Sequence, residues 1–222
     1  MRPWRRPPPS DDPRDRLLER LRPYVADERV LRAMREVPRE RFVPESRAAE
    51  AWHNVALPIG SGQTISQPLV VARMCELLEL TGDEQVLDVG TGSGYHAAVL
   101  ARLAGHVWSV ERHPGLSRRA AAALDATGVR NVTLLVGDGA LGHPEQAPYD
   151  AVNVAAAMGR VPDALAEQLT SGGRLVGPVD DGDQRLVLLR RGAGGVVERS
   201  AHERVRFVPL ITGANPDASP PA

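Results

Sequence analysis

Three glycines at alternate positions give the sequence its first candidate for a ligand site. They are Gly90, Gly92 and Gly94, with Thr91 between the first two, and they follow the apolar run 85–89. Alternating glycines let the backbone turn sharply and let a ligand lie directly against it. A helix that starts after such a turn presents free N–H groups. The pattern predicts a binding turn between a strand and a helix; the alternative is a tight turn that binds nothing.

The type of ligand is restricted by what the glycine turn lacks. A dinucleotide fingerprint has a glycine at its sixth position, and Tyr95 stands there instead. Every basic residue is arginine, so the lysine of a phosphate-binding loop is absent. The absence of lysine also excludes Schiff-base chemistry. The turn therefore favours a nucleoside ligand that carries no pyrophosphate.

Acidic residues follow the next two apolar runs. Glu111 ends the run that starts at residue 106, about 20 residues past the first glycine, where a carboxylate can accept both ribose hydroxyl protons. Asp138 and Gly139 follow the run 132–136. A carboxylate or a backbone N–H at that point can reach an adenine edge. Each acid alone fits a solvated or capping residue, but three acids at successive strand ends indicate a site.

The third acid, Asp88, lies within the first run and beside the glycine turn. It can orient the turn, or it can face a cationic group of the ligand. An adenosine derivative that carries a positive charge and no phosphate is S-adenosylmethionine, whose sulfur is a sulfonium. The sequence therefore predicts S-adenosylmethionine as the cofactor.

Alternating helix and strand patterns must position these residues. Strands are predicted at 85–89, 106–110, 132–136, 150–155, 173–179, 185–189 and 204–208, the last two antiparallel. Helices are predicted at 17–21, 30–34, 68–80, 95–104, 115–127 and 162–169, and residues 41–64 are predicted to be irregular. This alternation predicts an α/β fold with a mostly parallel sheet covered by helices on both faces. Ligands of such sheets bind at the carboxyl ends of the strands.

Composition predicts one domain between two tails. Residues 1–15 and 213–222 are rich in proline and polar residues and are predicted to be disordered. Residues 16–212 are predicted to form a single domain. Its part 16–80 holds N-terminal helices and a polar loop that can fold over the cleft, and its part 81–212 holds the cofactor-binding sheet.

The charge balance and the cysteine count exclude several classes of protein. The chain has 27 basic and 28 acidic residues, which argues against binding to nucleic acid or to an anionic membrane. No apolar run approaches the ~18 residues of a membrane span. Cys75 is the only cysteine, and the 6 histidines show no ligand spacing, so neither a disulfide nor a metal is expected. The basic start is followed by prolines rather than an apolar stretch, which predicts a cytoplasmic protein.

Several motifs make the chain similar to the protein-L-isoaspartate O-methyltransferase family. They are Val-Pro-Arg-Glu-Arg-Phe-Val-Pro at 37–44, Leu-Pro-Ile-Gly at 57–60, Gly-Gln-Thr-Ile-Ser-Gln-Pro at 62–68, residues 86–95, Val-Glu-Arg at 110–112, Gly-Asp-Gly at 137–139, residues 168–175 and Arg-Phe-Val-Pro-Leu at 206–210. The motif at 62–68 is specific to this family, whereas the glycine turn is shared by methyltransferases in general. The resemblance covers roughly residues 17–213.

The resemblance implies a role for each motif. Ser66 takes the place of the family's active-site serine, and residues 62–64 resemble a lid over the methionine part of the cofactor. The implied fold is a seven-stranded Rossmann-like methyltransferase sheet with a modified C-terminal strand order and N-terminal helices. The resemblance also implies that the protein is a monomer. The implied cofactor contacts are Gly62, Gln63, Thr64, Asp88, Gly90, Thr91, Gly92, Gly94, Glu111, Asp138 and Gly139.

The implied reaction transfers a methyl group to the side-chain carboxylate of an isoaspartyl residue. A carboxylate is already ionised at pH 7, so no strong base is needed. Ser66 would hold one carboxylate oxygen, and the product ester would close to a succinimide and start the repair of damaged proteins. Without the resemblance, Ser66 also fits a helix N-cap before Pro68.

Two other functions stay open at this point. Met158, Gly159 and Arg160 and the arginine-rich leader depart from the family pattern, as does His96. A methyltransferase for normal aspartate in a dedicated peptide is therefore one alternative. A non-catalytic module that binds adenosine is the other.

Overall fold

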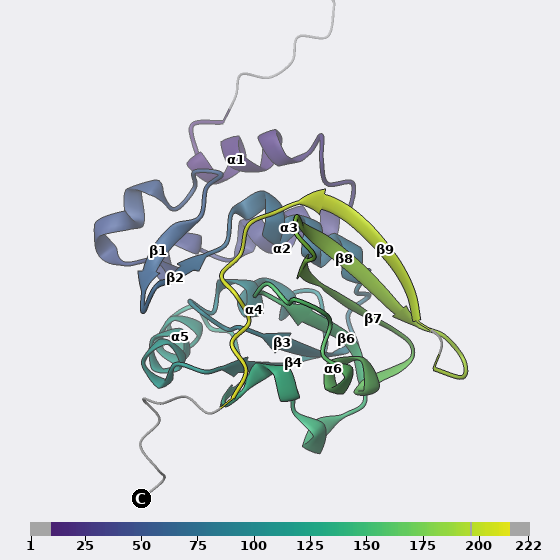
Figure 1. Ribbon diagram of the computed structural model, residues 1–222. Coiled ribbons are helices and arrows are strands. Elements are labelled where there is room, and N and C mark those ends of the chain that lie inside the picture. The colour runs from purple at the N-terminus through teal and green to yellow at the C-terminus, as the bar shows by residue number, and fades with distance from the viewer. Residues whose placement is uncertain (1–9, 196, 214–222) are drawn as a thin grey trace, which may run out of the picture.

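A seven-stranded sheet forms the centre of the computed structural model, which describes residues 10–195 and 197–213 (Figure 1). The strands are β3 (Gln85–Val89), β4 (His106–Glu111), β5 (Val132–Val136), β6 (Tyr149–Val154), β7 (Leu169–Asp180), β8 (Gln184–Arg191) and β9 (Val197–Arg204). Their order in space is β5-β4-β3-β6-β7-β8-β9. Because the order reverses beside β3, the carboxyl ends of β3 and β6 form a switch point where ligands bind in such sheets.

The central strands are apolar because both of their faces are covered. In β3 every residue after Gln85 is buried. Strand β3 pairs in parallel with β4 on one side and with β6 on the other. Strands β7, β8 and β9 then follow in chain order with antiparallel pairing. The predicted α/β class and the modified order of the last strands are confirmed.

Helices cover both faces, but unequally. The α-helices are α1 (Pro13–Leu21), α2 (Glu28–Glu36), α3 (Pro68–Leu78), α4 (Tyr95–Leu100), α5 (Pro114–Ala126) and α6 (Asp163–Glu167). Short 3-10 helices are η1 (Arg39–Phe42), η2 (Glu45–Glu50), η3 (Gly139–Leu141) and η4 (Pro144–Gln146). Helices α1 to α5 share one apolar cluster with one face of the sheet, and Leu165 of α6 belongs to the cluster on the other face. Among the described helices, none combines the length and the apolar character that a membrane crossing requires.

The predicted N-terminal tail, residues 1–15, is too long. Helix α1 begins at Pro13, a favourable first residue because its ring pre-sets the helical φ. The side chain of Asp12 accepts a hydrogen bond from the Arg14 N–H and caps the helix. Leu17 and Leu21 anchor the helix in the core. Residues 1–9 and 214–222, which hold the rest of the two predicted tails, lie outside the described residues.

A β-hairpin replaces part of the segment that was predicted to be irregular. Strand β1 (Leu57–Gly60) pairs with β2 (Gln63–Ile65) in antiparallel fashion. Leu57, Ile59 and Ile65 are buried beneath the hairpin, whereas Ser61 and Gly62 in its turn have positive φ. The hairpin leads through residue 66 into α3. We call residues 62–67 the lid segment.

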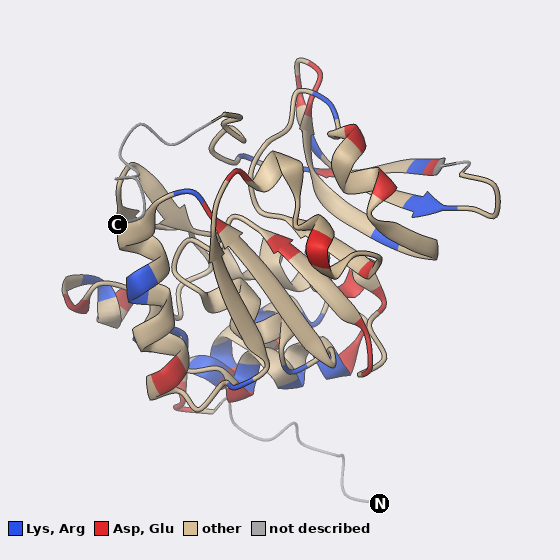
Figure 2. Cartoon of the chain, turned by 90° about the horizontal axis from the view of Figure 1, so that it is seen from below, with Lys and Arg blue, Asp and Glu red and all other residues tan. Residues whose placement is uncertain are grey.

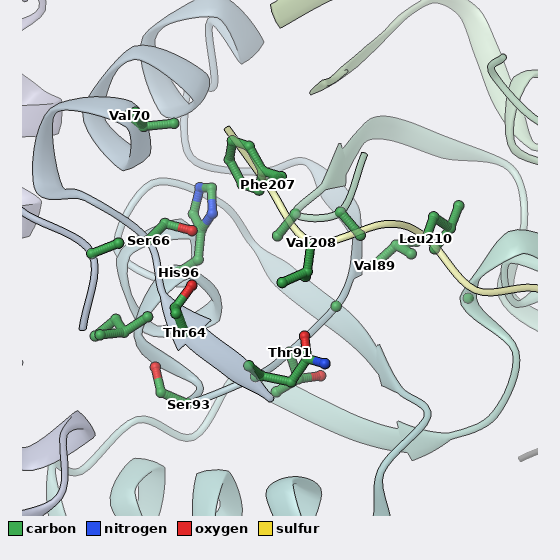
Figure 3. A pocket seen from close by; sticks show the side chains of 18 of the residues that line it. Thr64, Ser66, Val70, Val89, Thr91, Ser93, His96, Phe207, Val208 and Leu210 are labelled. Carbon is green, nitrogen blue, oxygen red and sulfur yellow. The ribbon is translucent and has the colours of Figure 1, made fainter. Parts of the chain in front are cut away.

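The last strand was predicted at 204–208, and the structure places it earlier, over Val197–Arg204. This stretch is polar and pairs on one side only, so it lacks the apolar run that identifies a buried strand. Residues 205–211, which we call the C-terminal segment, leave the sheet instead. Phe207, Val208 and Leu210 of this segment line a pocket (Figure 3).

Charged residues lie mainly outside the sheet. In Figure 2, acidic and basic segments are interspersed over the helices and loops, and the strands are mostly uncharged. The ion pairs among the described residues include Arg14–Glu40 and Arg73–Glu203, which connect elements far apart in sequence. This mixture agrees with the nearly balanced composition.

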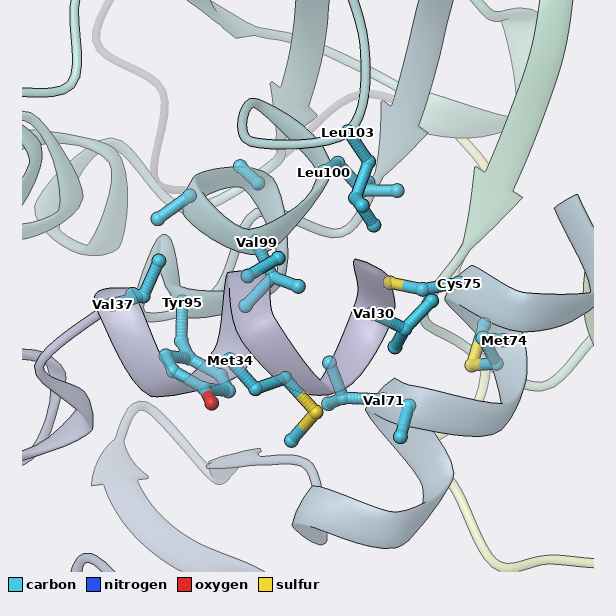
Figure 4. Packing of buried hydrophobic residues seen from close by; sticks show 14 of the residues in the cluster. Val30, Met34, Val37, Val71, Met74, Cys75, Tyr95, Val99, Leu100 and Leu103 are labelled. Atoms are coloured by element: carbon cyan, nitrogen blue, oxygen red, sulfur yellow. The ribbon is translucent and has the colours of Figure 1, made fainter. Parts of the chain in front are cut away.

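Helices α2, α3 and α4 meet in one apolar layer above the sheet (Figure 4). Val30 and Met34 come from α2, Val71 and Met74 from α3, and Val99 from α4, and none is more than 1% exposed. Such packing is dense, so a residue cannot be shortened without leaving a cavity. This layer fixes the position of α4 and of the glycine turn before it.

We expect Met34→Ala to lower the free energy of unfolding by about 2–4 kcal/mol, because it removes a fully buried side chain. Chemical denaturation followed by circular dichroism measures this change. Arg32→Ala, on the exposed side of α2, is the matched control and should change stability by less than about 0.5 kcal/mol. Equal effects of the two substitutions would contradict the described packing.

Candidate active site

A cavity of about 750 Å³ lies at the carboxyl ends of β3, β4 and β6. This volume is within the range of small-molecule sites, about 300–1,000 Å³. Three segments form its walls: the glycine turn, the lid segment and the C-terminal segment (Figure 3). The predicted residues that line it are Gln63, Thr64, Ser66, Gly90, Thr91, Gly92, Glu111 and Gly139. Gly62, Asp88, Gly94 and Asp138 are not among its lining residues.

The glycine turn has the backbone conformation that its sequence predicts. Gly90, Gly92 and Gly94 have φ values of +94°, +55° and +86°, which residues with a side chain rarely adopt. The Gly90 N–H donates to the Val110 carbonyl of β4 at 2.9 Å. A Cβ at Gly94 would lie 3.1 Å from the Ala120 Cβ. Gly94 therefore serves the close approach of α5 rather than the cavity.

Glu111 connects the end of β4 to the glycine turn. Its side chain is buried, and Oε2 accepts the Gly92 N–H at 2.8 Å. Its Oε1 accepts the His113 N–H at 2.8 Å. A carboxylate offers about four lone-pair sites, so both oxygens can still accept further hydrogen bonds. Glu111 thus shapes the turn and keeps acceptor capacity at the cavity wall, as a ribose-binding residue requires.

Asp88 lies beneath the cavity and not in its wall. It is fully buried, and its oxygens accept hydrogen bonds from Ser109 Oγ and Asn153 Nδ2, both at 2.7 Å. Because the Ser109 hydroxyl proton points at Asp88, Thr91 must donate to Ser109 across their 2.6 Å contact. Burial raises the pKa of Asp88 to about 6. Of the two predicted roles, the contacts fit the one in which Asp88 orients the turn.

His96 belongs to the same buried network and also lines the cavity. Its Nδ1 lies 3.3 Å from Asn153 Nδ2, and its Nε2 lies 3.5 Å from Cys75 Sγ. Since the Asn153 amide is a donor, Nδ1 accepts and the proton is on Nε2. Burial lowers the pKa of His96 to about 3, so the ring is neutral near pH 7. The only sequence signal for this residue was its departure from the family pattern.

Ser66 is held in the lid segment with its hydroxyl on the cavity side (Figure 3). In the part of the chain that the structure describes, its hydroxyl has no hydrogen-bond partner, whereas its carbonyl accepts from Arg39 at 2.8 Å. The N-terminus of α3 is capped instead by Asn54, whose Oδ1 accepts the Leu69 N–H at 3.0 Å. The alternative role of Ser66 as a helix cap is therefore wrong.

The C-terminal segment forms a wall that the sequence analysis did not assign to the site. Ala157, just after β6, donates to the Val208 carbonyl at 2.8 Å and accepts from the Leu210 N–H at 2.7 Å. These bonds hold Phe207, Val208 and Leu210 along one side of the cavity (Figure 3). The motif at 206–210 was noted for its resemblance, but its alternating apolar residues were interpreted as a sheet strand.

Asp138 faces the backbone and not the cavity. Its Oδ1 accepts the Ala140 N–H at 2.9 Å, and its Oδ2 accepts the Gly213 N–H at 2.6 Å. Gly139 lines the cavity, and a Cβ there would lie 2.5 Å from Val89 Cγ1. The backbone of Gly139 can therefore make the predicted contact with an adenine edge. The Asp138 carboxylate cannot make it in this position, because its oxygens bond the backbone.

The arrangement supports group transfer without proton abstraction. The cavity wall holds one carboxylate, three arginines, two histidines, several hydroxyl groups and apolar side chains, and the buried histidine, His96, is neutral near pH 7. Within residues 10–195 and 197–213, no group of three or more His, Cys, Asp or Glu side chains is placed to hold a metal ion. The site can therefore bind a nucleoside and position a second, already ionised reactant beside it.

Known proteins match the chain over nearly its whole length. Residues 13–215 match the family model described as Protein-L-isoaspartate(D-aspartate) O-methyltransferase (PCMT). A relative named protein-L-isoaspartate O-methyltransferase from Anaeromyxobacter dehalogenans is 55% identical over 189 residues, 84% of this chain and 90% of the relative. Another of the same name from Erwinia tasmaniensis is 50% identical over 198 residues, 89% of this chain and 95% of the relative.

Solved structures share the fold. A protein-L-isoaspartate O-methyltransferase structure is 28% identical, with a TM-score of 0.81 over 90% of this chain and 66% of that chain. A structure described as a beta-aspartate methyltransferase (PCMT) from Plasmodium falciparum, in complex with S-adenosyl-L-homocysteine, is 24% identical, with a TM-score of 0.76 over 88% of this chain and 97% of that chain. The second supports the fold alone.

The buried, neutral His96 predicts a specific pH dependence of stability. Its pKa of about 3 in the folded protein lies below the ordinary 6.5, so the unfolded chain binds a proton there first as the pH falls. Between pH 7.5 and 5.0 this costs the wild type about 2 kcal/mol, and His96→Gln should lose less stability over that range. The raised pKa of Asp88 has the opposite effect, because it increases the stability of the folded protein as the pH falls below 6. Asp88 is present in both the wild type and His96→Gln, so this effect does not distinguish them.

Thermal unfolding at a series of pH values measures this difference. His53→Gln is the matched control, because His53 is exposed and lies outside the buried network. The same loss of stability in the wild type and in His96→Gln would show that the ring is not neutral and buried.

Proposed function

The chain belongs to the protein-L-isoaspartate O-methyltransferase family, and from this premise we propose that the cavity described above is its active site. The chain is an S-adenosylmethionine-dependent enzyme that methylates the free carboxylate of isoaspartyl residues in peptides and proteins. The observation that carries the assignment of the site is the Ser66 hydroxyl, which faces the cavity with no partner among the described residues.

The lining residues fit S-adenosylmethionine. Glu111 has free acceptor sites for two ribose hydroxyls. Gly139 lines the same cavity and packs closely against Val89, and its backbone can bond the edge of a base. Val110 and Leu210 offer apolar contacts beside it. When bound, the cofactor supplies a methyl group on a sulfonium; the carboxylate oxygen gains the new O–C bond, sulfur keeps the electron pair of the broken C–S bond, and no proton is transferred.

Ser66 acts on the second reactant, the isoaspartyl carboxylate. Its hydroxyl donates a hydrogen bond to one carboxylate oxygen and leaves the other free to react. Since the carboxylate is already ionised at pH 7, Ser66 does not need a partner that removes its proton. Positioning of this kind contributes a large part of the rate enhancement in reactions between two bound groups.

The apolar walls act by excluding water. Val71 of α3 and Phe207 and Val208 of the C-terminal segment line the cavity. A carboxylate and a sulfonium lose opposite charges as they react, so a site with little water favours the reaction. The methyl ester formed has methoxide as its leaving group, which departs far more readily than the oxide that a carboxylate would have to lose. The neighbouring backbone nitrogen then attacks the ester carbonyl and closes a succinimide, while methoxide leaves with the nitrogen's proton as methanol. Hydrolysis of the succinimide returns some normal aspartate.

Two finer points belong to the same proposal. The enzyme acts as a monomer on protein substrates, as the family resemblance implies. It does not bind nucleic acid, which is supported by the net charge of −1 and the interspersed charges. It works in the cytoplasm, which is supported by Cys75 being a single, buried, free cysteine. The sequence of residues 158–160 was one reason to consider a dedicated aspartyl substrate. Met158 is buried against β7, and residues 158–160 do not line the cavity, so their positions do not support that alternative.

We expect the enzyme to methylate an isoaspartyl peptide and to leave the matched aspartyl peptide nearly unmodified. Transfer of labelled methyl groups from S-adenosylmethionine to the two peptides measures this preference. Equal labelling, or labelling of the aspartyl peptide alone, would instead support the dedicated-peptide alternative. Cofactor binding with no labelling of either peptide would support the non-catalytic module.

Ser66→Ala should lower kcat on the isoaspartyl peptide by about 10- to 1,000-fold, because it removes the donor that orients the carboxylate. Its affinity for S-adenosylmethionine, measured by calorimetry, should change little. Ser171→Ala, on the exposed part of β7 and outside the cavity, is the control and should keep wild-type activity. Loss of cofactor affinity with normal turnover of the bound cofactor would assign Ser66 to cofactor binding.

A further inference from the structure

Arg39 is a buried guanidinium group that the proposed reaction does not use. It is 0% exposed, although it lies in the short helix η1 near the N-terminus. Among the described residues it forms no ion pair with a carboxylate; its partners are carbonyl groups and an aromatic ring. Burying a charge in this way is costly, so a position that keeps one has a use for its geometry.

The guanidinium contacts three segments at once. Its Nε donates to the Ala51 carbonyl at 2.8 Å, and its Nη2 donates to the Ser66 carbonyl at 2.8 Å. Its central carbon lies 4.7 Å from the centre of the Tyr95 ring. The same ring packs edge-to-face with Phe42, with the ring centres 5.8 Å apart and the planes at 66°.

Two of these three contacts belong to different walls of the cavity. Ser66 is part of the lid segment, and Tyr95 is the first residue of α4, directly after the glycine turn. The third contact, Ala51, precedes Asn54, which caps α3 at the end of the lid segment. Arg39 is therefore the side chain through which the lid segment and the glycine turn are fixed relative to each other.

We infer that Arg39 is a positioning residue for methyl transfer, which sets where the Ser66 hydroxyl stands relative to the glycine turn; this inference rests on the proposed function. The Ser66 carbonyl is bonded to Arg39, and the hydroxyl has no partner among the described residues, so the position of the hydroxyl follows from its χ1 rotamer and from the backbone that Arg39 holds. An error of about 1 Å in the position of a reacting group can cost about 100-fold in rate.

Only arginine can make this set of contacts. Its planar fork donates in two directions and still presents a face to an aromatic ring. A lysine at the same place keeps the charge and the attraction to Tyr95, but it lacks the planar fork whose separate nitrogens, Nε and Nη2, reach the two carbonyls. Methionine keeps the apolar stem and removes the buried charge, but it leaves the Ala51 and Ser66 carbonyls without this donor.

The test is a double-substitution cycle on kcat with an isoaspartyl peptide. Arg39→Lys should lower kcat by about 10- to 100-fold, while the dissociation constant for S-adenosylmethionine changes by less than about threefold. In the Ser66→Ala background, Arg39→Lys should lower kcat further by less than about threefold, because both changes remove the same interaction. Arg41→Lys, on the exposed side of η1, is the control and should keep wild-type kcat.

The outcomes separate this inference from the proposed function. If Ser66→Ala alone keeps full activity, the proposed function of the site fails. If Ser66→Ala loses activity but the losses from Arg39→Lys and Ser66→Ala multiply, Arg39 does not act through Ser66 and the inference is overturned. Arg39→Met gives a second test in a neutral background: a folded variant with low kcat supports the inference. If neither variant shows a cooperative thermal transition, Arg39 is a structural residue and the inference is also overturned.

Discussion

The whole site depends on one backbone constraint, the left-handed turn that follows β3. Three glycines make the turn possible, and hydrogen bonds from β4 hold it: among them, the Val110 carbonyl accepts from Gly90, and the Glu111 carboxylate accepts from Gly92. Because β3 and β4 are neighbours in a parallel sheet, their carboxyl ends meet, and the second bond brings an acid to the cavity wall. The Glu111 carboxylate thus stabilises the glycine turn and also faces the predicted ligand. A substitution of Glu111 would therefore affect both the turn and ligand binding.

Beneath the turn, polar groups replace the apolar packing found elsewhere in the core. Asp88, Ser109 and Thr91 form one branch of a buried network, and Asn153 extends it to His96. Each bond raises the cost of moving any member, since an unpaired polar group in the interior is expensive. The network therefore holds the floor of the cavity rigid at the point where the central strands end. A site that works by position needs such a floor, and apolar contacts alone specify direction less strictly than hydrogen bonds.

The sequence predicted what depends on local pattern and missed what depends on distant contact. The strands from β3 to β8 have strong apolar runs, and the glycine turn has a conformation that few other residues allow, so both were predictable. The roles of Asp88 and Asp138 were less predictable, because an acid at a strand end fits either a ligand contact or a structural contact. Only the fold shows that Asp88 bonds buried side chains and that Asp138 bonds the backbone. The C-terminal segment was misinterpreted because an alternating apolar stretch looks the same whether it pairs with a strand or lines a cavity.

The chemistry explains why so many of these contacts are structural. Transfer of a methyl group to an ionised carboxylate needs no base and no metal, so the protein must supply only geometry and a dry cavity. Segments from both ends of the chain then close the cavity: the lid segment, tied to the core through Arg39, and the C-terminal segment, tied to the end of β6 through Ala157. Both are held chiefly by bonds to their carbonyl and N–H groups, which leaves their side chains free to face the reactants. In such a site, hydrogen bonds of the backbone fix the segments, and the side chains of those segments contact the reactants. Its specificity therefore depends on how firmly the lid segment and the C-terminal segment are held.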